Sequence, residues 1–528
     1  MIRIHTHDGQ HLELAPDQRL TLAQAIFLAP TGGAGLWDGV PLCAGLGKCG
    51  LCRVRYVSAA PQATADEARR LGQASLDQGW RLSCLHPAET CDIELPEPKR
   101  SGRPRQGQPQ PAQAAQADAD IALAVDLGTT SVHWTALMGR DVLASGQELN
   151  PQMGLGSEVM SRLGFAARPG GAEILQNLIL DRLRQLARAA GARAGRPVTR
   201  LCVAGNSAMT YILLGLPVGG LARAPYSLGY AGGDDRSIAP DLPETRIPPL
   251  LAPFVGGDLS AGLAALTFGP EAPRYPFLLA DLGTNGEFVL ALSPSEYLLA
   301  SVPMGPALEG VGLRHGRTAA AGAVRAFALT PAGLKPEYVE RPPLPDEDPG
   351  ITGVGYLSLA AALLRAGVLD ESGRFMVPAT PLGQRLAKGL ASVNGEASLA
   401  LGSGLFLPAS DVEELVKVKA AFNLALSRLL AEAALPASAL AAVHLAGAMG
   451  EHVSARDLVT LGFLPEALAG VLLRAGNTSL KGSQLLLNSP EAWDWVRALP
   501  AKCRALDLAS DPGFGSLYVE RMVLRHVA

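Results

Sequence analysis

The sequence predicts an α/β protein of several domains, the largest of which is internally duplicated. A chain of 528 residues is longer than one domain usually is. One short pattern occurs twice, first at Asp126 and again at Asp281, 155 positions further on. Three closely spaced cysteines and a fourth, more distant one lie near the N-terminus. These observations divide the chain into a cysteine-bearing front part and a repeated rear part.

Each copy of the repeated pattern predicts a β-hairpin whose tight turn can hold a phosphate. The strings IALAVDLGTTSVHWTAL and FLLADLGTNGEFVLAL are apolar runs that end in Asp-Leu-Gly-Thr and continue as a second strand-like run. A glycine lets the backbone approach an anion, threonine hydroxyls and amides donate to it, and an aspartate can hold Mg²⁺ through water. One copy is also compatible with an ordinary Asx turn. A pair suggests a nucleotide between two related halves.

The order of strand, Asp-x-Gly-Thr and strand differs from a Walker loop, which continues into a helix with Gly-Lys-Ser/Thr. The chain instead resembles the sugar kinase, heat-shock chaperone and actin superfamily, in which the first turn binds the terminal phosphates and the second completes the metal and phosphate cage. In that superfamily a glycine-bearing segment ahead of a helix touches adenosine, and VHLAGAMGEHVSARDL, with Gly447 and Gly450, is similar to it. The resemblance implies a duplicated actin-like ATPase fold over 120–528, with ATP and Mg²⁺ as ligands.

The four cysteines predict an iron-sulfur site. Cys43, Cys49 and Cys52 form a C-x5-C-x2-C pattern, and Cys84 follows after 31 residues. Close thiolate spacing on a glycine-rich loop, with one distant partner, is typical of a ferredoxin-like 2Fe-2S cluster. Zinc is the competing ligand, because four cysteines also make structural zinc sites, although these usually come as two close pairs. His86 is expected to be an exposed loop residue.

The surrounding residues predict a β-grasp ferredoxin fold over 1–97. MIRIHTHDG and QHLELAP indicate two short strands joined by Asp-Gly, LTLAQAIFLA a helix, RVRYV a strand and CDIELPE a closing strand. The remaining cysteines, Cys91, Cys202 and Cys503, are expected to be small buried residues. Because no signal peptide is evident and four thiols are assigned to metal, we expect a cytoplasmic protein.

Residues 98–119 have the composition of a flexible linker. The segment is rich in Pro, Gln, Ala and Gly, and a flexible chain of 22 residues spans about 25 Å on average. We therefore expect the ferredoxin module to swing between an electron source and a sink. The net charge of −4 gives no general case for nucleic-acid binding. The longest apolar stretches are too short to span a bilayer, so neither nucleic acid nor a membrane is an expected partner.

Further strings raise the resemblance from superfamily to family. The chain resembles the reductive activators of corrinoid-dependent enzymes in six segments: NPQMGLGSEVMSRL (150–163), VAGNSAMTYILLGL (203–216), DLGTNGE (281–287), GPALEGVGLRHG (305–316), AGAVRAF (321–327) and RAGNTSLKGSQLLL (474–487). Members of that family use a 2Fe-2S domain to reduce an inactive Co(II) corrinoid to Co(I), and they bind or consume ATP in doing so. Better-studied members carry a middle domain after the linker, which we expect to be missing here.

The family resemblance implies a function and its partners. We expect an ATP-dependent activator that passes one electron from its 2Fe-2S cluster to the Co(II) corrinoid of a methyltransferase system. The expected partners are that corrinoid protein and a low-potential electron donor, and a homodimer is compatible with the sequence. A redox-regulated small-molecule kinase and a nucleotide-binding iron-sulfur adaptor stay open as alternatives. The intact turns count against the adaptor, and the family-level strings count against the kinase.

The expected site residues follow from these motifs. Asp126, Asp281 and Glu287 are expected to organise metal and water, and Glu287 is equally compatible with a solvated strand position. Asn206 and Glu309 are further candidates, each also compatible with a structural role. The turns and the third element are expected to contact the nucleotide through Gly128, Thr129, Thr130, Gly283, Thr284, Asn285, Gly447 and Gly450. The expected cluster ligands are Cys43, Cys49, Cys52 and Cys84.

Overall fold

The computed structural model describes residues 1–29, 42–97, 120–345, 347–447, 453–508 and 511–528. The chain forms two compact units. The first comprises Met1–Arg103, Met153–Ser157 and Pro306–Lys417, and the second comprises Pro104–Gln152, Glu158–Gly305 and Val418–Ala528. The predicted linker, 98–119, lies outside the described residues, and the predicted domain boundaries stay a prediction.

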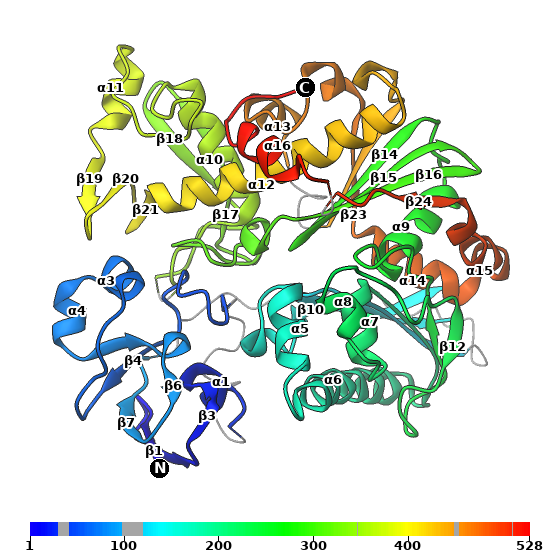
Figure 1. Cartoon of the computed structure of the whole chain (residues 1–528), viewed down its shortest axis with the longest axis horizontal. Helices are drawn as coiled ribbons and strands as arrows, with labels where there is room; N and C mark the ends of the chain where they lie inside the picture. The colour runs from blue at the N-terminus through cyan, green and yellow to red at the C-terminus, as the bar shows by residue number, and fades with distance from the viewer. Residues whose placement is uncertain (30–41, 98–119, 346, 448–452, 509–510) are drawn as a thin grey trace. The chain divides into compact units, whose positions relative to one another are not determined.

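The N-terminal part of the first unit is a mixed five-stranded sheet in the order β2-β1-β7-β4-β5 (Figure 1). The strand β1 (Ile2–His5) pairs antiparallel with β2 (His11–Leu14) and parallel with the central strand β7 (Cys91–Glu94). The antiparallel strands β4 (Arg53–Tyr56) and β5 (Trp80–Leu82) complete the sheet. The strands β1, β2, β4 and β7 lie where the sequence predicted them, whereas β5 was not predicted, and the sheet is consistent with the predicted ferredoxin-like fold.

Short helices and a small two-stranded sheet accompany this five-stranded sheet. The predicted helix is α1 (Leu22–Phe27), which begins at a capping box formed by Thr21 and Gln24. The other elements are β3 (Asp17–Thr21), α3 (Ala65–Leu71), α4 (Gln73–Asp77), η1 (Ser83–Leu85) and β6 (Pro87–Ala88). Alternation along β1 turns Ile2 and Ile4 inward, where they join Leu22, Val54 and Ile93 in a dry core.

The rest of the first unit contains a β-hairpin, a three-stranded sheet and helices. Its elements are η3 (Pro306–Glu309), β17 (Val324–Thr330), β18 (Gly333–Tyr338), α10 (Gly353–Arg365), α11 (Pro381–Ala387), β19 (Leu390–Val393), β20 (Glu396–Gly402) and β21 (Leu405–Pro408). The long helix α12 (Ala409–Glu432) begins in this unit. The helix α10 is apolar on nearly all sides because it is buried along almost its whole length.

The second unit contains two six-stranded sheets with the same inner pattern. The first has the order β10-β9-β8-β11-β13-β12, and the second has the order β23-β22-β14-β15-β16-β24. In each sheet three consecutive antiparallel strands are followed by a parallel strand, β11 beside β8 and β22 beside β14. The shared pattern confirms the duplication that the repeated motif predicted. The strand bounds are β8 (Ile121–Leu127), β9 (Ser131–Met138), β10 (Asp141–Leu149), β11 (Val198–Gly205), β12 (Asp234–Arg236), β13 (Thr245–Ile247), β14 (Phe277–Leu282), β15 (Asn285–Ser293), β16 (Glu296–Pro303), β22 (Ala442–Gly447), β23 (Leu472–Gly476) and β24 (Cys503–Ala505).

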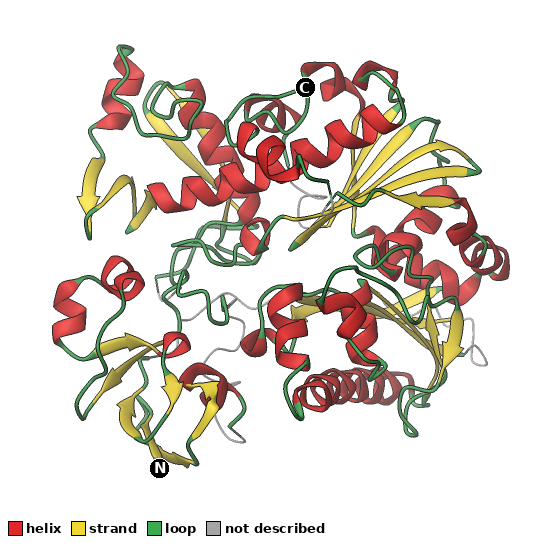
Figure 2. Ribbon diagram, in the orientation of Figure 1, coloured by secondary structure: helices red, strands yellow, loops and turns green. Residues whose placement is uncertain are grey.

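Two helices, α9 (Gly257–Thr267) and α14 (Thr478–Asn488), pack closely within the core of this unit. Their contact depends on small residues, because a Cβ on Gly482 would lie 2.0 Å from the carbonyl oxygen of Ala261. The other helices of the unit, drawn in red in Figure 2, are α5 (Val159–Ala166), α6 (Gly171–Ala194), α7 (Ser207–Leu213), α8 (Gly219–Ala222), α13 (Ala455–Thr460), α15 (Pro490–Arg497) and α16 (Phe514–Glu520).

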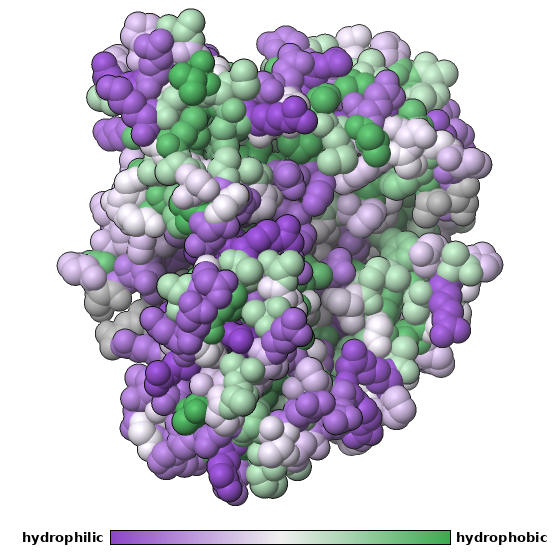
Figure 3. Space-filling model, turned by 60° about the vertical axis from the view of Figure 1, so that its left-hand side comes forward, coloured by the Kyte–Doolittle hydropathy of each residue, from purple (hydrophilic) through white to green (hydrophobic). Residues whose placement is uncertain are grey.

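Hydrophilic and hydrophobic residues are interspersed on the face of the protein that Figure 3 shows. Within the described part of the chain, every helix is too short or too polar to cross a membrane.

Candidate functional site

The two Asp-Leu-Gly-Thr turns meet in the second unit. The first connects β8 to β9, and the second connects β14 to β15. The hydroxyl oxygens of Thr130 and Thr284 lie 3.2 Å apart, and both side chains are buried. The side-chain amide of Asn206 donates to the hydroxyl of Thr129 at 2.9 Å. The structure therefore brings together threonines that the sequence separates by more than 150 positions.

The backbone of the first turn is fixed from behind by two side chains. The Asn150 amide donates to the carbonyl oxygen of Gly128 at 2.7 Å, and the Arg162 guanidinium donates to that of Thr129 at 2.8 Å. Arg162 is fully buried and comes from α5. The sequence analysis quoted the segment that holds Asn150 and Arg162 as a family string but assigned neither residue a role.

Four carboxylates gather beside the two turns. Asp281 and Glu287 are directly opposite each other on the antiparallel strands β14 and β15. Asp258, in the first turn of α9, and Asp126, at the end of β8, interact electrostatically with Glu287 as well. Like charges directly opposite each other destabilise a sheet. This arrangement therefore calls for a cation or for protonation of some of the group. Asp258 was missed because no motif surrounds it in the sequence.

The pKa values of two of these four acids, Glu287 and Asp258, show the same conflict. Burial, together with the charges of Asp258, Asp281 and Asp126, raises the pKa of Glu287 well above its usual value. Burial and the charge of Asp126 raise the pKa of Asp258 to about 7. Glu287 is 5% exposed, which excludes the solvated position considered above, and among the described residues its Oε1 has no hydrogen-bond partner. A buried, unpartnered acceptor beside three other acids is suited to a metal ion or its water.

The carboxylate of Asp126 is held by the N-terminus of α14. The Asn477 amide donates to Oδ2 of Asp126 at 2.6 Å, and the Ser479 hydroxyl donates to Oδ1 at 2.8 Å. Asn477 also caps the helix by accepting from the backbone N–H of Leu480 at 2.7 Å. Asp126 thereby anchors α14 as well as facing the other acids. The sequence did not reveal this second role, because the partners lie about 350 positions away.

Gly447 leaves room for Asp281. It ends β22, has φ +71°, and is the register partner of Leu282 on β14. A Cβ at this position would lie 2.3 Å from Oδ1 of Asp281. The backbone N–H of Gly283 donates to the carbonyl oxygen of Asn285 at 3.1 Å and closes the second turn. The predicted nucleotide contact Gly450 lies outside the described residues.

Glu309 lies in η3 of the first unit, and its proposed role stays a prediction.

The four predicted cluster ligands come together in the first unit as free, buried thiols. The Cys43 thiol hydrogen-bonds those of Cys49 and Cys84, and the Cys84 thiol also hydrogen-bonds that of Cys52. Hydrogen bonds from Cys49 and Cys84 lower the pKa of Cys43 well below its usual value. The hydrogen bond to Cys43, together with burial, raises the pKa of Cys49. Without a metal ion the group therefore favours one thiolate, whereas a bound cluster would require all four thiols to be deprotonated.

The donor chemistry fits a cluster held on a glycine loop. Gly45, Gly47 and Gly50 all have positive φ, and a Cβ on Gly47 would lie 3.1 Å from Cδ1 of Leu85. In the described part of the chain, no three His, Cys, Asp or Glu side chains are already arranged to hold a single metal ion. A two-iron cluster spreads its ligands over a wider space than one ion does. The same finding is compatible with Mg²⁺ at the carboxylates beside the two turns, because Mg²⁺ usually takes only one or two carboxylates and completes its coordination with water and phosphate.

His86 is buried, contrary to the expectation of an exposed loop residue. It is 7% exposed, and its Nε2 lies 2.8 Å from Oε1 of the fully buried Glu67. The structure also buries Cys202, whereas Cys91 and Cys503 are only partly buried.

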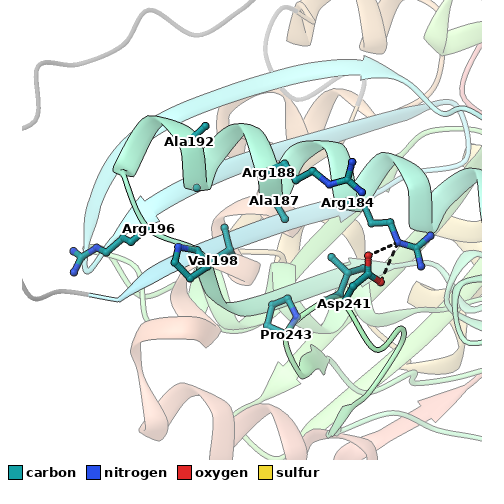
Figure 4. Close-up of a pocket in the computed structure, with 11 residues that line it drawn as sticks. Arg184, Ala187, Arg188, Ala192, Arg196, Val198, Asp241 and Pro243 are labelled. Carbon is teal, nitrogen blue, oxygen red and sulfur yellow. Dashed lines mark hydrogen bonds and ion pairs between the residues drawn. The ribbon is translucent and has the colours of Figure 1, made fainter.

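A separate surface pocket of about 400 Å³ lies where α6 ends and β11 begins (Figure 4). Arg184, Arg188 and Arg196 lie along it, and Arg184 donates to both oxygens of Asp241 at 2.9 and 3.1 Å. It contains none of the predicted site residues.

Comparison with known proteins agrees with this class of fold, a duplicated nucleotide-binding domain. Residues 276–528 match the family model described as the C-terminal domain of RACo, the ASKHA domain, and residues 121–269 match the RACo middle region. The chain belongs to this family of reductive activators of corrinoid-dependent enzymes. The second match contains the first turn and the first six-stranded sheet, which are part of the duplicated ATPase region expected over 120–528. The expected loss of a further domain between the linker and that region stays a prediction.

Relatives and a solved structure are similar over most of the chain. Corrinoid activation enzyme RamQ of Eubacterium limosum is 28% identical over 425 residues, 75% of this chain and 69% of that protein. The [Co(II) methylated amine-specific corrinoid protein] reductase of Methanosarcina barkeri is 26% identical over 441 residues, 75% of this chain and 76% of that protein. The structure of a reductive activator for corrinoid, iron-sulfur protein superposes with a TM-score of 0.68 at 23% identity, over 100% of this chain and 99% of that chain. This likeness establishes the fold.

Proposed function

We propose that this protein is an ATP-dependent reductive activator that passes one electron from a 2Fe-2S cluster to the Co(II) corrinoid of a methyltransferase system, restoring Co(I). The observation that carries the proposal is that one chain contains both a group of four buried thiols and a pair of facing phosphate-type turns. Family membership and the names of the two relatives support the same activity.

The proposed cluster ligands are Cys43, Cys49, Cys52 and Cys84. A 2Fe-2S cluster bound there supplies one-electron chemistry, which the side chains of this fold do not supply themselves. The thiols are buried and their loop is closed by glycines, so the chain excludes water from the site. A low-potential donor protein is the proposed electron source. Four thiols kept free are consistent with a reducing cytoplasm, which we propose as the location.

The proposed nucleotide site consists of the two turns and the carboxylates beside them. The hydroxyls of Thr130 and Thr284 would donate to phosphate oxygens, with Gly128, Gly283 and Thr129 shaping the turns. Asp126 and Asp281 would hold Mg²⁺, in part through water, and its charge would relieve the repulsion among the four acids. Asn285 and Gly447 would line the same site.

The arrangement can also support hydrolysis. Water would attack the terminal phosphorus while the bond to the bridging oxygen breaks, which releases ADP and phosphate. Glu287 is the proposed acceptor of the water proton, because its Oε1 is buried and has no other partner among the described residues. Burial and the charges of Asp258, Asp281 and Asp126 raise the pKa of Glu287, and neutralisation of those charges would lower it again and favour the ionised form. Acceptance of the water proton by Glu287 would then depend on Mg²⁺ and nucleotide being bound.

Coupling of the two sites has a thermodynamic reason. A Co(II)/Co(I) corrinoid couple should lie below the potential of an ordinary 2Fe-2S centre, and each ~59 mV of uphill one-electron transfer costs about 1.4 kcal/mol. ATP offsets such a cost only by interacting differently with two states of the complex. We infer that binding and hydrolysis of ATP change the affinity of this protein for the corrinoid protein. The change would either weaken a cobalt ligand or release the product.

The decisive experiment mixes the anaerobically purified protein, a low-potential reductant and a Co(II) corrinoid protein, with and without Mg-ATP. Co(I) absorption that grows faster or further with ATP is the expected result. If Mg-ATP changed neither the rate nor the extent of reduction, the protein would act as a ferredoxin without coupling to ATP. Absence of reduction, together with a phosphorylated small molecule in the same preparation, would favour a kinase.

A further inference from the structure

A buried glutamate holds the chain segment that carries Cys84. Glu67 is fully buried near the start of α3, a helix that contains no cysteine. Its Oε1 accepts a hydrogen bond from the backbone N–H of Leu82 at 2.7 Å and lies 2.8 Å from Nε2 of His86. Leu82 and His86 stand two positions before and two positions after Cys84. One carboxylate oxygen therefore ties both ends of segment 82–86.

The other carboxylate oxygen fixes Glu67 to the start of its own helix. Oε2 accepts from the backbone N–H of Thr64 at 2.8 Å, and the Thr64 hydroxyl accepts from the N–H of Glu67 at 3.2 Å. This reciprocal pair is a capping box, which sets the position of the first helical turn. A buried carboxylate is costly unless it is hydrogen-bonded. Here Thr64, Leu82 and His86 all form hydrogen bonds with the Glu67 carboxylate.

The same segment also reaches a second proposed ligand. Ser83 donates twice to the carbonyl oxygen of Cys52, from its backbone N–H at 3.1 Å and from its hydroxyl at 2.6 Å. The carbonyl oxygen of His86 accepts from the N–H of Leu22 at 2.8 Å, at the start of α1. Cys52, Ser83 and Cys84 are all at least 95% buried. The segment is thus held between Glu67 on one side and the Cys52 loop on the other.

We propose that Glu67 is a positioning residue for Cys84, setting where the fourth ligand of the cluster stands relative to Cys52. The inference rests on the proposed function, because it takes the four thiols to be cluster ligands. Outer hydrogen-bond partners orient the ligands of a metal site, and their loss weakens the site although they never touch the metal. Without the carboxylate, the N–H of Leu82 and the His86 ring lose a shared buried acceptor, and the segment is free to shift.

The test compares three variants of the full-length protein after anaerobic loading with iron and sulfide. Glu67→Ala removes all three hydrogen bonds to the carboxylate. Thr64→Ala is the matched control, because it removes the hydroxyl of the same capping box and leaves the carboxylate to serve Leu82 and His86. Glu67→Gln keeps an oxygen for Leu82, so it should recover part of what Glu67→Ala loses. The readouts are the EPR spectrum of the reduced protein and the rate of absorbance loss in the presence of an iron chelator.

We expect Glu67→Ala to shift the EPR lines and to lose its cluster at least tenfold faster than the unmodified protein. Thr64→Ala should lower thermal stability and leave the EPR lines in place. An unchanged spectrum and cluster lifetime in Glu67→Ala would overturn the proposal. So would equal effects of Glu67→Ala and Thr64→Ala, because the helix cap alone would then explain them.

A second measurement needs no cluster and separates this inference from the proposed function. In protein free of iron, the rate at which an alkylating reagent labels Cys84 is followed by peptide mass spectrometry. Glu67→Ala should label Cys84 at least tenfold faster than Thr64→Ala, because the segment is released. Equal rates would refute the positioning role. If the unmodified protein took up no cluster but the labelling rates differed as expected, Glu67 would still be shown to hold Cys84 in place, and the electron-transfer proposal would fall.

Discussion

Replacement of Gly447 by alanine tests whether Asp281 is needed at its observed position. Gly447 has φ +71°, and the new Cβ would lie 2.3 Å from Oδ1 of Asp281 and 2.8 Å from the carbonyl oxygen of Leu282. Real Cβ contacts rarely fall below 3.4 Å, so the carboxylate or the strand must move by about 1 Å. The left-handed backbone costs an alanine roughly 1–2 kcal/mol, and the overpacking adds about 1–3 kcal/mol.

Gly195→Ala is the matched control for the free-energy cost of placing alanine in a left-handed backbone conformation. Gly195 ends α6 with φ +72°, and a Cβ there would meet no atom within 4 Å. Both variants are assayed by denaturant unfolding and by phosphate release from Mg-ATP. We expect Gly195→Ala to lose roughly 1–2 kcal/mol of unfolding free energy and to keep its turnover. Gly447→Ala should lose about 2–5 kcal/mol, and its turnover should fall roughly 100-fold, because 1 Å of misplacement has that effect on catalysis.

Equal turnover in the two variants would refute the reasoning. It would mean either that Asp281 does not take part in turnover or that the sheet absorbs the added methyl group elsewhere. Calorimetric titration with Mg-ATP distinguishes these outcomes, because a displaced Asp281 that matters for binding weakens the affinity of Gly447→Ala alone.

Three further predictions concern the same unit. Because burial and Asp126 raise the pKa of Asp258 to about 7, the folded protein without Mg²⁺ keeps a proton that the unfolded chain releases above pH about 4. Stability in EDTA should therefore fall as the pH rises from about 4 to about 7. Asp258→Asn should flatten this slope in thermal unfolding scans, and a curve parallel to that of the unmodified protein would contradict the assignment. Asp281→Ala should abolish ATP turnover while sparing the visible spectrum of the cluster, and unchanged phosphate release would remove Asp281 from the site. Arg162→Gln should weaken Mg-ATP binding by about tenfold, since it loosens a hydrogen bond to Thr129 worth roughly 1.5–3 kcal/mol; calorimetry that finds the original affinity would show that the turn holds its shape without Arg162.

Local patterns were sufficient to predict most of the fold. Alternation in the first strands, the Asp-Gly turn and the repeated Asp-Leu-Gly-Thr hairpins each depend on residues close together in the chain, and all are confirmed. The facing of Thr130 and Thr284 was expected only because the repeat implied two related halves. The cysteine spacing likewise predicted that four thiols would meet.

Residues recruited from distant parts of the chain could not be predicted in this way. Asp258 stands in an ordinary apolar helix, and only its burial beside Asp126 raises its pKa. Asn477 and Ser479 lie in a string noted for its family resemblance, yet their bonds to Asp126 cross most of the second unit's sequence. His86 was misjudged because its partner Glu67 comes from α3, 19 positions earlier, and a polar residue in a loop is more often exposed.

The 3.2 Å contact between the hydroxyls of Thr130 and Thr284 has a mechanical consequence. A single phosphate oxygen that accepts a hydrogen bond from both would hold them roughly 4.5 Å apart, given an O···O distance of about 2.7 Å on each side. A phosphate oxygen bound by both hydroxyls would therefore separate them by more than 1 Å relative to this structure. Each hydroxyl belongs to a turn between two strands of its own six-stranded sheet, so one phosphate oxygen would link the two related halves of the second unit.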